Sequence, residues 1–109
     1  MNKDVLKELY DVVSGRKINP QEGSYTCYLF DKGLDKILKK VGEECAETII
    51  ASKNTNDEEL VGEICDLMYH LTVLMVERNI PIEDVFEELN KRSAKIGNLK
   101  NMKVVDRNT

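Results

Sequence analysis

The sequence predicts an all-α protein of four helices. Apolar residues recur at helical spacing in four segments, and polar, Pro or Gly residues separate these segments. No segment alternates apolar and polar side chains in the way that a half-buried strand does. The 109 residues are expected to form one domain, and so small a core would gain from packing against a second copy.

The first helix is expected over residues 3–14, where apolar side chains follow a helical period. Gly15 is expected to end this helix, since glycine commonly follows the last helical residue. Residues 16–26 (RKINPQEGSYT) are then expected to form a loop, because Pro20 and Gly23 interrupt regular structure.

The second helix is expected over residues 34–52. We expect its apolar face to pack in the core, together with Cys45 and, on the next helix, Cys65 as small apolar side chains. Three cysteines without a CxxC pair indicate a reducing compartment and not a disulfide framework. The apolar face of the second helix comprises Leu34, Ile37, Leu38, Val41, Cys45 and Ile49.

The third helix is expected over residues 58–78, after a polar break and an N-terminal Asp57. Its apolar residues occupy much more of the helix circumference than the stripe of about 100° that a surface helix needs. The helix is therefore expected to be covered on two sides. Pro81 is expected to begin a fourth helix, whose apolar face holds Phe86 and Leu89. The tail beyond Gly97 shows no clear period and is left unassigned.

Charge and hydropathy exclude several classes of partner. A net charge of −4 argues against non-specific nucleic-acid binding, which needs a basic surface. No apolar run approaches the roughly 20 residues of a membrane span, and residues 1–10 lack a secretory apolar region, so a cytoplasmic location is expected. If the ligand is a phosphate compound, a divalent metal is the obvious group to neutralise it.

Two carboxylate pairs, each with an i, i+3 spacing, carry the functional prediction. Glu44 and Glu47 lie at the border of the apolar face of the second helix, and Glu63 and Asp66 lie on the strongly apolar third helix. If the two helices pack side by side, the four carboxylates converge and require a cation between them. All-oxygen ligation favours Mg²⁺, with Mn²⁺ as the second choice.

An ordinary solvated surface is the alternative for the second helix. Lys36, Lys40 and Glu43 share the flank of the acidic motif and would then form i, i+4 ion pairs with it. This alternative is weaker for the third helix, which is too apolar to be exposed throughout. On that helix, His70 is expected to be a buried structural group more than a metal ligand.

The motifs also resemble known enzymes. The sequence contains an ExxE motif, then fifteen residues, then an ExxD motif. This arrangement resembles that of the all-α, MazG-like nucleoside triphosphate pyrophosphohydrolase superfamily. NPQEGSYTCYLFDKGLDKILKKVGEECAETIIASK, followed by ELVGEICDLMYHLTVLMVERNI, resembles phosphoribosyl-ATP pyrophosphohydrolases of histidine biosynthesis more narrowly. This resemblance covers Val5 to Arg92, and its most specific parts are GSYT, LF and KKVGEE.

The resemblance implies a reaction and an assembly. Phosphoribosyl-ATP would be hydrolysed between its α and β phosphates, giving phosphoribosyl-AMP and pyrophosphate with Mg²⁺ as cofactor. It also implies a homodimer that completes a four-helix, MazG-like bundle, in agreement with the wide apolar arc of the third helix.

The resemblance further assigns roles to residues. Glu44, Glu47, Glu63 and Asp66 would bind the metal. Glu47 would also orient or deprotonate the attacking water, and Glu43 would assist near the metal or act as a base. The candidate substrate-binding residues are Lys36, Lys40, Gly23, Ser24, Tyr25 and Thr26, with Arg16, Lys17, Asn90 and Arg92 as weaker candidates.

Two other functions compete with this one. A house-cleaning (d)NTP pyrophosphatase would share the metal site but would not need the NPQEGSYT loop. A non-catalytic dimeric helical module would tolerate neutral groups at Glu63 and Asp66 and would not respond to metal. For the lysines the alternative is a plain surface position, and for the loop it is a turn with a buried tyrosine.

Overall fold

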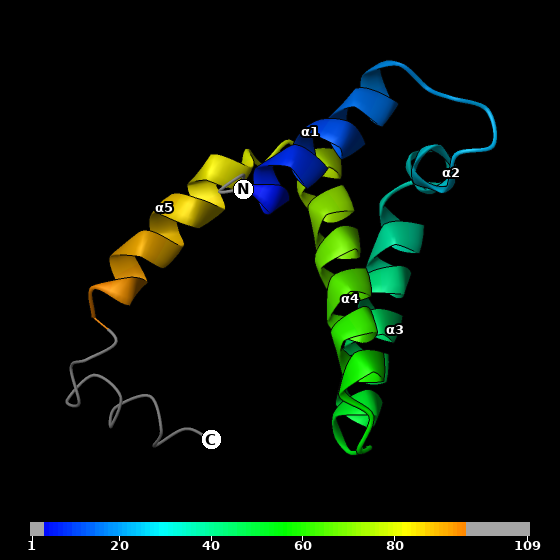
Figure 1. The fold of residues 1–109 in the computed structure, drawn as a ribbon. Coiled ribbons are helices and arrows are strands. Elements are labelled where there is room, and N and C mark those ends of the chain that lie inside the picture. Colours follow the sequence, from blue (N-terminus) through cyan, green and yellow to red (C-terminus); the bar gives the residue numbers. More distant parts are fainter. Residues whose placement is uncertain (1–3, 96–109) are drawn as a thin grey trace.

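The computed structural model describes residues 4–95, and all regular secondary structure within that range is helical (Figure 1). The all-α prediction is confirmed, but these residues form five helices and not four. The start predicted at Lys3 and the tail after Gly97 lie outside the described range. The helices are α1 (Val5–Ile18), α2 (Tyr25–Lys32), α3 (Leu34–Ser52), α4 (Asp57–Glu77) and α5 (Ile82–Ser93).

Helix α1 continues past the glycine that was predicted to end it. The Asp4 side chain caps its start by accepting a hydrogen bond from the Lys7 backbone N–H, and the helix reaches Ile18. The backbone N–H of Asn19 donates to the carbonyl of Gly15 at 2.8 Å, which closes the last turn. The predicted stop was wrong because a glycine costs a helix only about 1 kcal/mol relative to alanine, and basic residues favour the turn that follows it.

Helix α2 occupies part of the predicted loop. The Ser24 hydroxyl caps it by accepting from the backbone N–H of Cys27 at 3.2 Å, and Gly33 ends it with a φ of 93°. Its aromatic and β-branched residues have weak helix propensity, which explains why periodicity missed it. Leu29 anchors α2 in the core and has no exposed surface.

Helices α3 and α4 form a long antiparallel pair, joined by a short polar turn (Figure 1). Their observed bounds agree with the predicted ones within a residue. The Asn56 side chain caps α4 by accepting from the backbone N–H groups of Glu58 and Glu59. Helix α5 begins one residue after Pro81 and extends away from this pair.

The face of α3 that packs on α4 differs from the predicted apolar face. Ile37 and Ala51 are buried, and the Thr48 hydroxyl donates to the carbonyl of Glu44 at 2.7 Å and lies 3.4 Å from that of Glu63. The side chains of Leu38, Cys45 and Ile49, which were expected in the core, are exposed on the chain, as is that of Cys65 on α4.

The core lies where α1 and α2 join the α3–α4 pair. Tyr10 of α1 donates its hydroxyl proton to the carbonyl of Ile80 at 2.8 Å, and Lys17 pairs with Glu77 at 3.3 Å, so the middle and the last turn of α1 are tied to the end of α4 and to the turn that follows it. The buried core side chains are Val13, Leu29, Ile37, Val73 and Val76.

The described surface retains a long apolar stripe. Val61, Ile64, Met68 and Leu71 recur at helical spacing along α4, and each is at least 37% exposed. Within residues 4–95, the wide apolar arc of this helix is therefore covered on one side only. Among residues 4–95, no helix is long and apolar enough to cross a membrane.

Candidate active site

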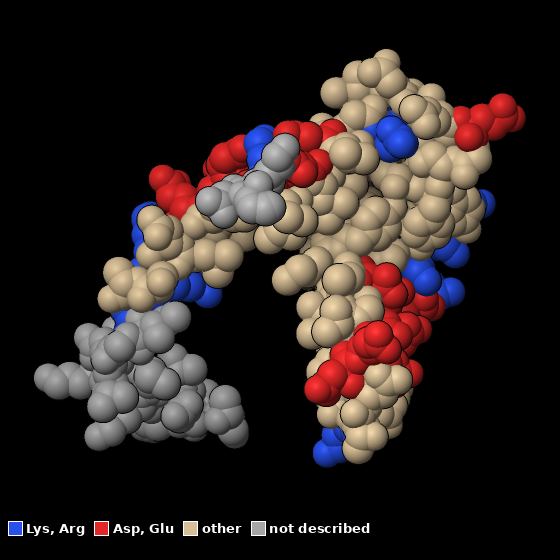
Figure 2. Space-filling view, viewed as in Figure 1, with Lys and Arg blue, Asp and Glu red and all other residues tan. Residues whose placement is uncertain are grey.

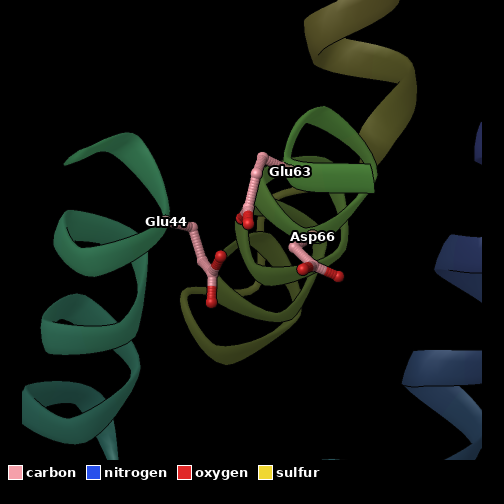
Figure 3. Close-up of side chains that lie close together, drawn as sticks. All are labelled: Glu44, Glu63 and Asp66. Carbon is pink, nitrogen blue, oxygen red and sulfur yellow. The ribbon is translucent and has the colours of Figure 1, made fainter. Parts of the chain in front are cut away.

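Three carboxylates meet between α3 and α4. One oxygen atom of each of Glu44, Glu63 and Asp66 lies within 4.8 Å of the others. Glu44 reaches from the middle of α3 towards α4, where Glu63 and Asp66 stand one turn apart (Figure 3). The i, i+3 spacing puts the two α4 carboxylates on one side of their helix, and the packing of α3 brings Glu44 to them.

The electrostatic environment of the cluster is unfavourable for its charges. Glu44 is only 6% exposed, and the Oε1 atoms of Glu44 and Glu63 are buried without a hydrogen-bond partner among the described residues. Burial, followed by the charges of Glu47 and Asp66, raises the pKa of Glu44. Burial, then a hydrogen bond and the charge of Glu47, raises the pKa of Glu63 to about 6. Among the described residues, the cation recorded next to these carboxylates is Lys40, whose Nζ atom is 3.9 Å from Oε2 of Glu44, and it does not reach the two buried Oε1 atoms.

A divalent cation fits this arrangement. Two buried, unpartnered carboxylate oxygens are costly unless they coordinate something, and an all-oxygen donor set suits a hard ion. Figure 2 shows acidic side chains gathered along the arm formed by α3 and α4. Glu47 is exposed and lies outside the group of three, but its carboxylate is close enough to Glu63 to raise the pKa of that residue.

Lys40 lies at the edge of the cluster. Its Nζ atom is 3.1 Å from Oε1 of Glu43 and 3.9 Å from Oε2 of Glu44. The hydrogen bond with Glu43 raises the pKa of Lys40 and lowers the pKa of Glu43. Glu43 thus faces the lysine and does not belong to the three converging carboxylates.

The loop residues expected to bind substrate lie at the start of α2. The Tyr25 hydroxyl is 3.0 Å from Nε2 of His70, and His70 Nδ1 is 2.8 Å from the backbone carbonyl of Asp66. His70 is 5% exposed, as expected for a buried structural group. Thr26 forms a short hydrogen bond with the Tyr69 hydroxyl. These contacts attach the start of α2 to the part of α4 that carries the cluster.

The remaining predicted residues are spread more widely. The ammonium group of Lys36 lies 5.8 Å from the centre of the Tyr28 ring. Arg16 and Lys17 belong to the last turn of α1 and not to a loop. Asn90 and Arg92 belong to α5, which points away from the α3–α4 pair, so the chain does not bring them to the cluster (Figure 1).

An aromatic group around Tyr25 was not predicted from the sequence. Its ring stacks on Tyr28 at 6.1 Å and on Tyr69 at 6.2 Å between ring centres. The i, i+3 spacing of Tyr25 and Tyr28 was the available signal, but it has meaning only once α2 is recognised as a helix.

The sequence profile of the family described as phosphoribosyl-ATP pyrophosphohydrolase matches residues 6–93. A phosphoribosyl-ATP pyrophosphatase of Clostridium novyi is 59% identical over 99 residues, covering 91% of this chain and 90% of that protein. A protein of the same name from Bacillus mycoides is 51% identical over 104 residues, covering 95% and 97%.

A longer relative shows the same similarity. The histidine biosynthesis bifunctional protein HisIE of Caldanaerobacter subterraneus is 59% identical over 92 residues, which are 84% of this chain and 45% of that protein. These matches include both α3 and α4, which carry the three converging carboxylates. The chain therefore belongs to the phosphoribosyl-ATP pyrophosphohydrolase family.

Proposed function

We propose that the chain hydrolyses phosphoribosyl-ATP to phosphoribosyl-AMP and pyrophosphate, the second step of histidine biosynthesis. The observation that carries this proposal is the similarity along 91% of the chain to a protein named phosphoribosyl-ATP pyrophosphatase. The acidic cluster between α3 and α4 supports a reaction at a phosphate anhydride, because such a reaction needs a cation beside the phosphate oxygens.

We propose that Glu44, Glu63 and Asp66 hold Mg²⁺, or Mn²⁺ in its place, with Glu47 as a fourth ligand. The support is the two orphaned carboxylate oxygens and the all-oxygen donor set. When bound, such an ion neutralises phosphate oxygens and polarises the anhydride.

The proposed roles of the other polar residues follow from their positions. Glu47 is exposed beside Glu63, so its carboxylate can accept a proton from a water that attacks phosphorus. Lys40 offers an ammonium group next to Glu44 for a phosphate oxygen, and Glu43 holds this lysine in place. Lys36 lies one turn before Lys40 on the same helix and would bind the neighbouring phosphate.

We further propose that the enzyme is a cytoplasmic homodimer. The exposed stripe on α4 and the projecting α5 are what a second copy would cover, since apolar stripes of this length mark interfaces. The partner copy would also be the means by which Asn90 could approach a substrate, because α5 points away from its own cluster.

Pyrophosphate release from phosphoribosyl-ATP with Mg²⁺ tests the proposal. Glu63→Gln should abolish release, whereas Glu58→Gln, a matched change in the exposed first turn of α4, should leave it intact. ATP and the dNTPs serve as competing substrates. Release from dNTPs without release from phosphoribosyl-ATP would replace this function by that of a house-cleaning pyrophosphatase.

A further inference from the structure

The hydrogen bonds around His70 point to a role that the carboxylate cluster does not supply. We propose that His70 is a positioning residue which makes the Tyr25 hydroxyl an acceptor for a hydroxyl or amino group of the substrate. This inference rests on the proposed function for the identity of the substrate. Tyr25 and His70 lie next to the groups that are proposed to bind phosphate.

The backbone carbonyl of Asp66 fixes the tautomer of His70. A carbonyl oxygen only accepts hydrogen bonds, so Nδ1 of His70, 2.8 Å away, must carry a proton. In the neutral imidazole Nε2 is then an acceptor, and the Tyr25 hydroxyl 3.0 Å away donates to it. The proton of that hydroxyl is therefore directed inwards, to a histidine that is 5% exposed.

The oxygen of Tyr25 keeps lone pairs free for a ligand. Tyr25 is 45% exposed as a residue, and its O–H bond is held by His70. A hydroxyl that has already donated its proton can only accept, so it would repel a phosphate oxygen and attract an N–H or O–H group. A nucleotide substrate carries such donors as ribose hydroxyls and amino groups, and these are the groups we assign to Tyr25.

The position of the Tyr25 ring is fixed on several sides. It stacks on Tyr28 and Tyr69, and the His70 ring meets it edge-to-face at 5.8 Å between centres. Burial raises the pKa of the Tyr25 phenol, with the nearby Lys40 acting in the opposite direction, so the phenol keeps its proton at neutral pH. Through His70, which also contacts the backbone carbonyl of Asp66, this hydroxyl lies next to the residues of the carboxylate cluster.

Kinetics of four variants test the binding half of the proposal. Tyr25→Phe should raise KM for phosphoribosyl-ATP by roughly 3- to 10-fold and leave kcat nearly unchanged, because the lost bond is made in the ground state and the transition state alike. His70→Leu should raise KM by a similar factor, and the double variant should be no worse than Tyr25→Phe. His70→Gln, whose amide oxygen can accept from Tyr25, should largely restore KM.

Tyr28→Phe is the matched control, since its hydroxyl makes no hydrogen bond within the described residues. An unchanged KM in Tyr25→Phe would overturn the proposal. Additive effects of the Tyr25→Phe and His70→Leu changes would also overturn it, because two independent contacts would then be lost.

A spectroscopic test needs no activity. His70 is the only histidine of the chain, so ¹⁵N NMR of the imidazole yields one set of ring signals. We expect the Nδ1–H tautomer at neutral pH, and the Nε2–H tautomer would overturn the proposal. If the wild-type chain released no pyrophosphate, the proposed function and the assignment of the substrate group would fall together. The tautomer would still decide whether His70 directs the Tyr25 proton inwards.

Discussion

The carboxylates of Glu44 on α3 and Glu63 on α4 face each other across the interface of the two helices, and each leaves its Oε1 atom buried without a hydrogen-bond partner among residues 4–95. A folded chain that holds like charges in this way is destabilised by their repulsion and by their loss of hydration. Any cation that binds there removes both penalties, so the stability of the fold should depend on metal.

The first prediction is that Mg²⁺ stabilises the folded protein. At a Mg²⁺ concentration 100-fold above Kd, the expected gain in free energy of unfolding is about 2.7 kcal/mol, which for a domain of this size raises Tm by on the order of 10 °C. The measurement is thermal unfolding with and without Mg²⁺, at constant ionic strength and protein concentration.

The control for this prediction is a pair of variants. Glu63→Gln should lose most of the metal-dependent rise in Tm, and Glu58→Gln, in the exposed first turn of α4, should keep it. An equal rise in both variants would mean that Mg²⁺ acts elsewhere. No rise in the wild-type chain would support the non-catalytic helical module.

The second prediction concerns pH in the absence of metal. Because the folded state raises the pKa of Glu63 from 4.5 to about 6, the folded chain binds more protons than the unfolded chain between these values. This residue therefore lowers stability as pH rises from about 4.5 to 6. We expect Glu63→Gln to be more stable than the wild-type chain above pH 6, and the difference in Tm to shrink towards pH 4.5. A difference that is constant over this range would contradict a raised pKa.

The third prediction concerns the exposed stripe on α4. Met68 is 45% exposed in the middle of this stripe, so Met68→Glu would place a charge in the interface with a second copy. Light scattering should then give a mass near 12.5 kDa for the variant and twice that for the wild-type chain. Met68→Leu, which keeps the site apolar, should remain dimeric. A wild-type chain that is monomeric at all concentrations would remove the proposed dimer.

Periodicity could predict α3, α4 and α5 because polar breaks and Pro81 separate long apolar patterns. It could not predict which apolar face of α3 packs within the chain. Ile37 is buried and Leu38 is exposed, yet both are equally apolar, and a face that contacts a partner has the same composition as a core face. The sequence thus indicates that an apolar face must be buried, but it does not indicate whether the same chain or a partner buries it.

The candidate site was also predictable only in part. The spacing predicted that four carboxylates converge, and three of them, Glu44, Glu63 and Asp66, do so, whereas Glu47 lies outside the group. The pairing of Tyr25 with His70 was not predictable, because it depends on α2 and on a contact between residues 45 positions apart. Local cues for α2 existed in Ser24 and Gly33, but a weak helix propensity between them hid the helix.

The last prediction tests the helix that passes through a glycine. Gly15 lies inside α1, its φ is not positive, and an added Cβ would meet no atom within 4 Å. Gly15→Ala should therefore raise the free energy of unfolding by about 0.5–1 kcal/mol, as alanine loses less backbone entropy in a helix. Gly33→Ala is the opposite case, since a φ of 93° strains any side chain, and it should destabilise the chain. Urea unfolding of both variants measures the two signs. A loss of stability in Gly15→Ala would contradict this prediction. It would indicate that α1 ends at this glycine, because a residue that ends a helix in the left-handed conformation is destabilised by a Cβ atom even where there is space for it.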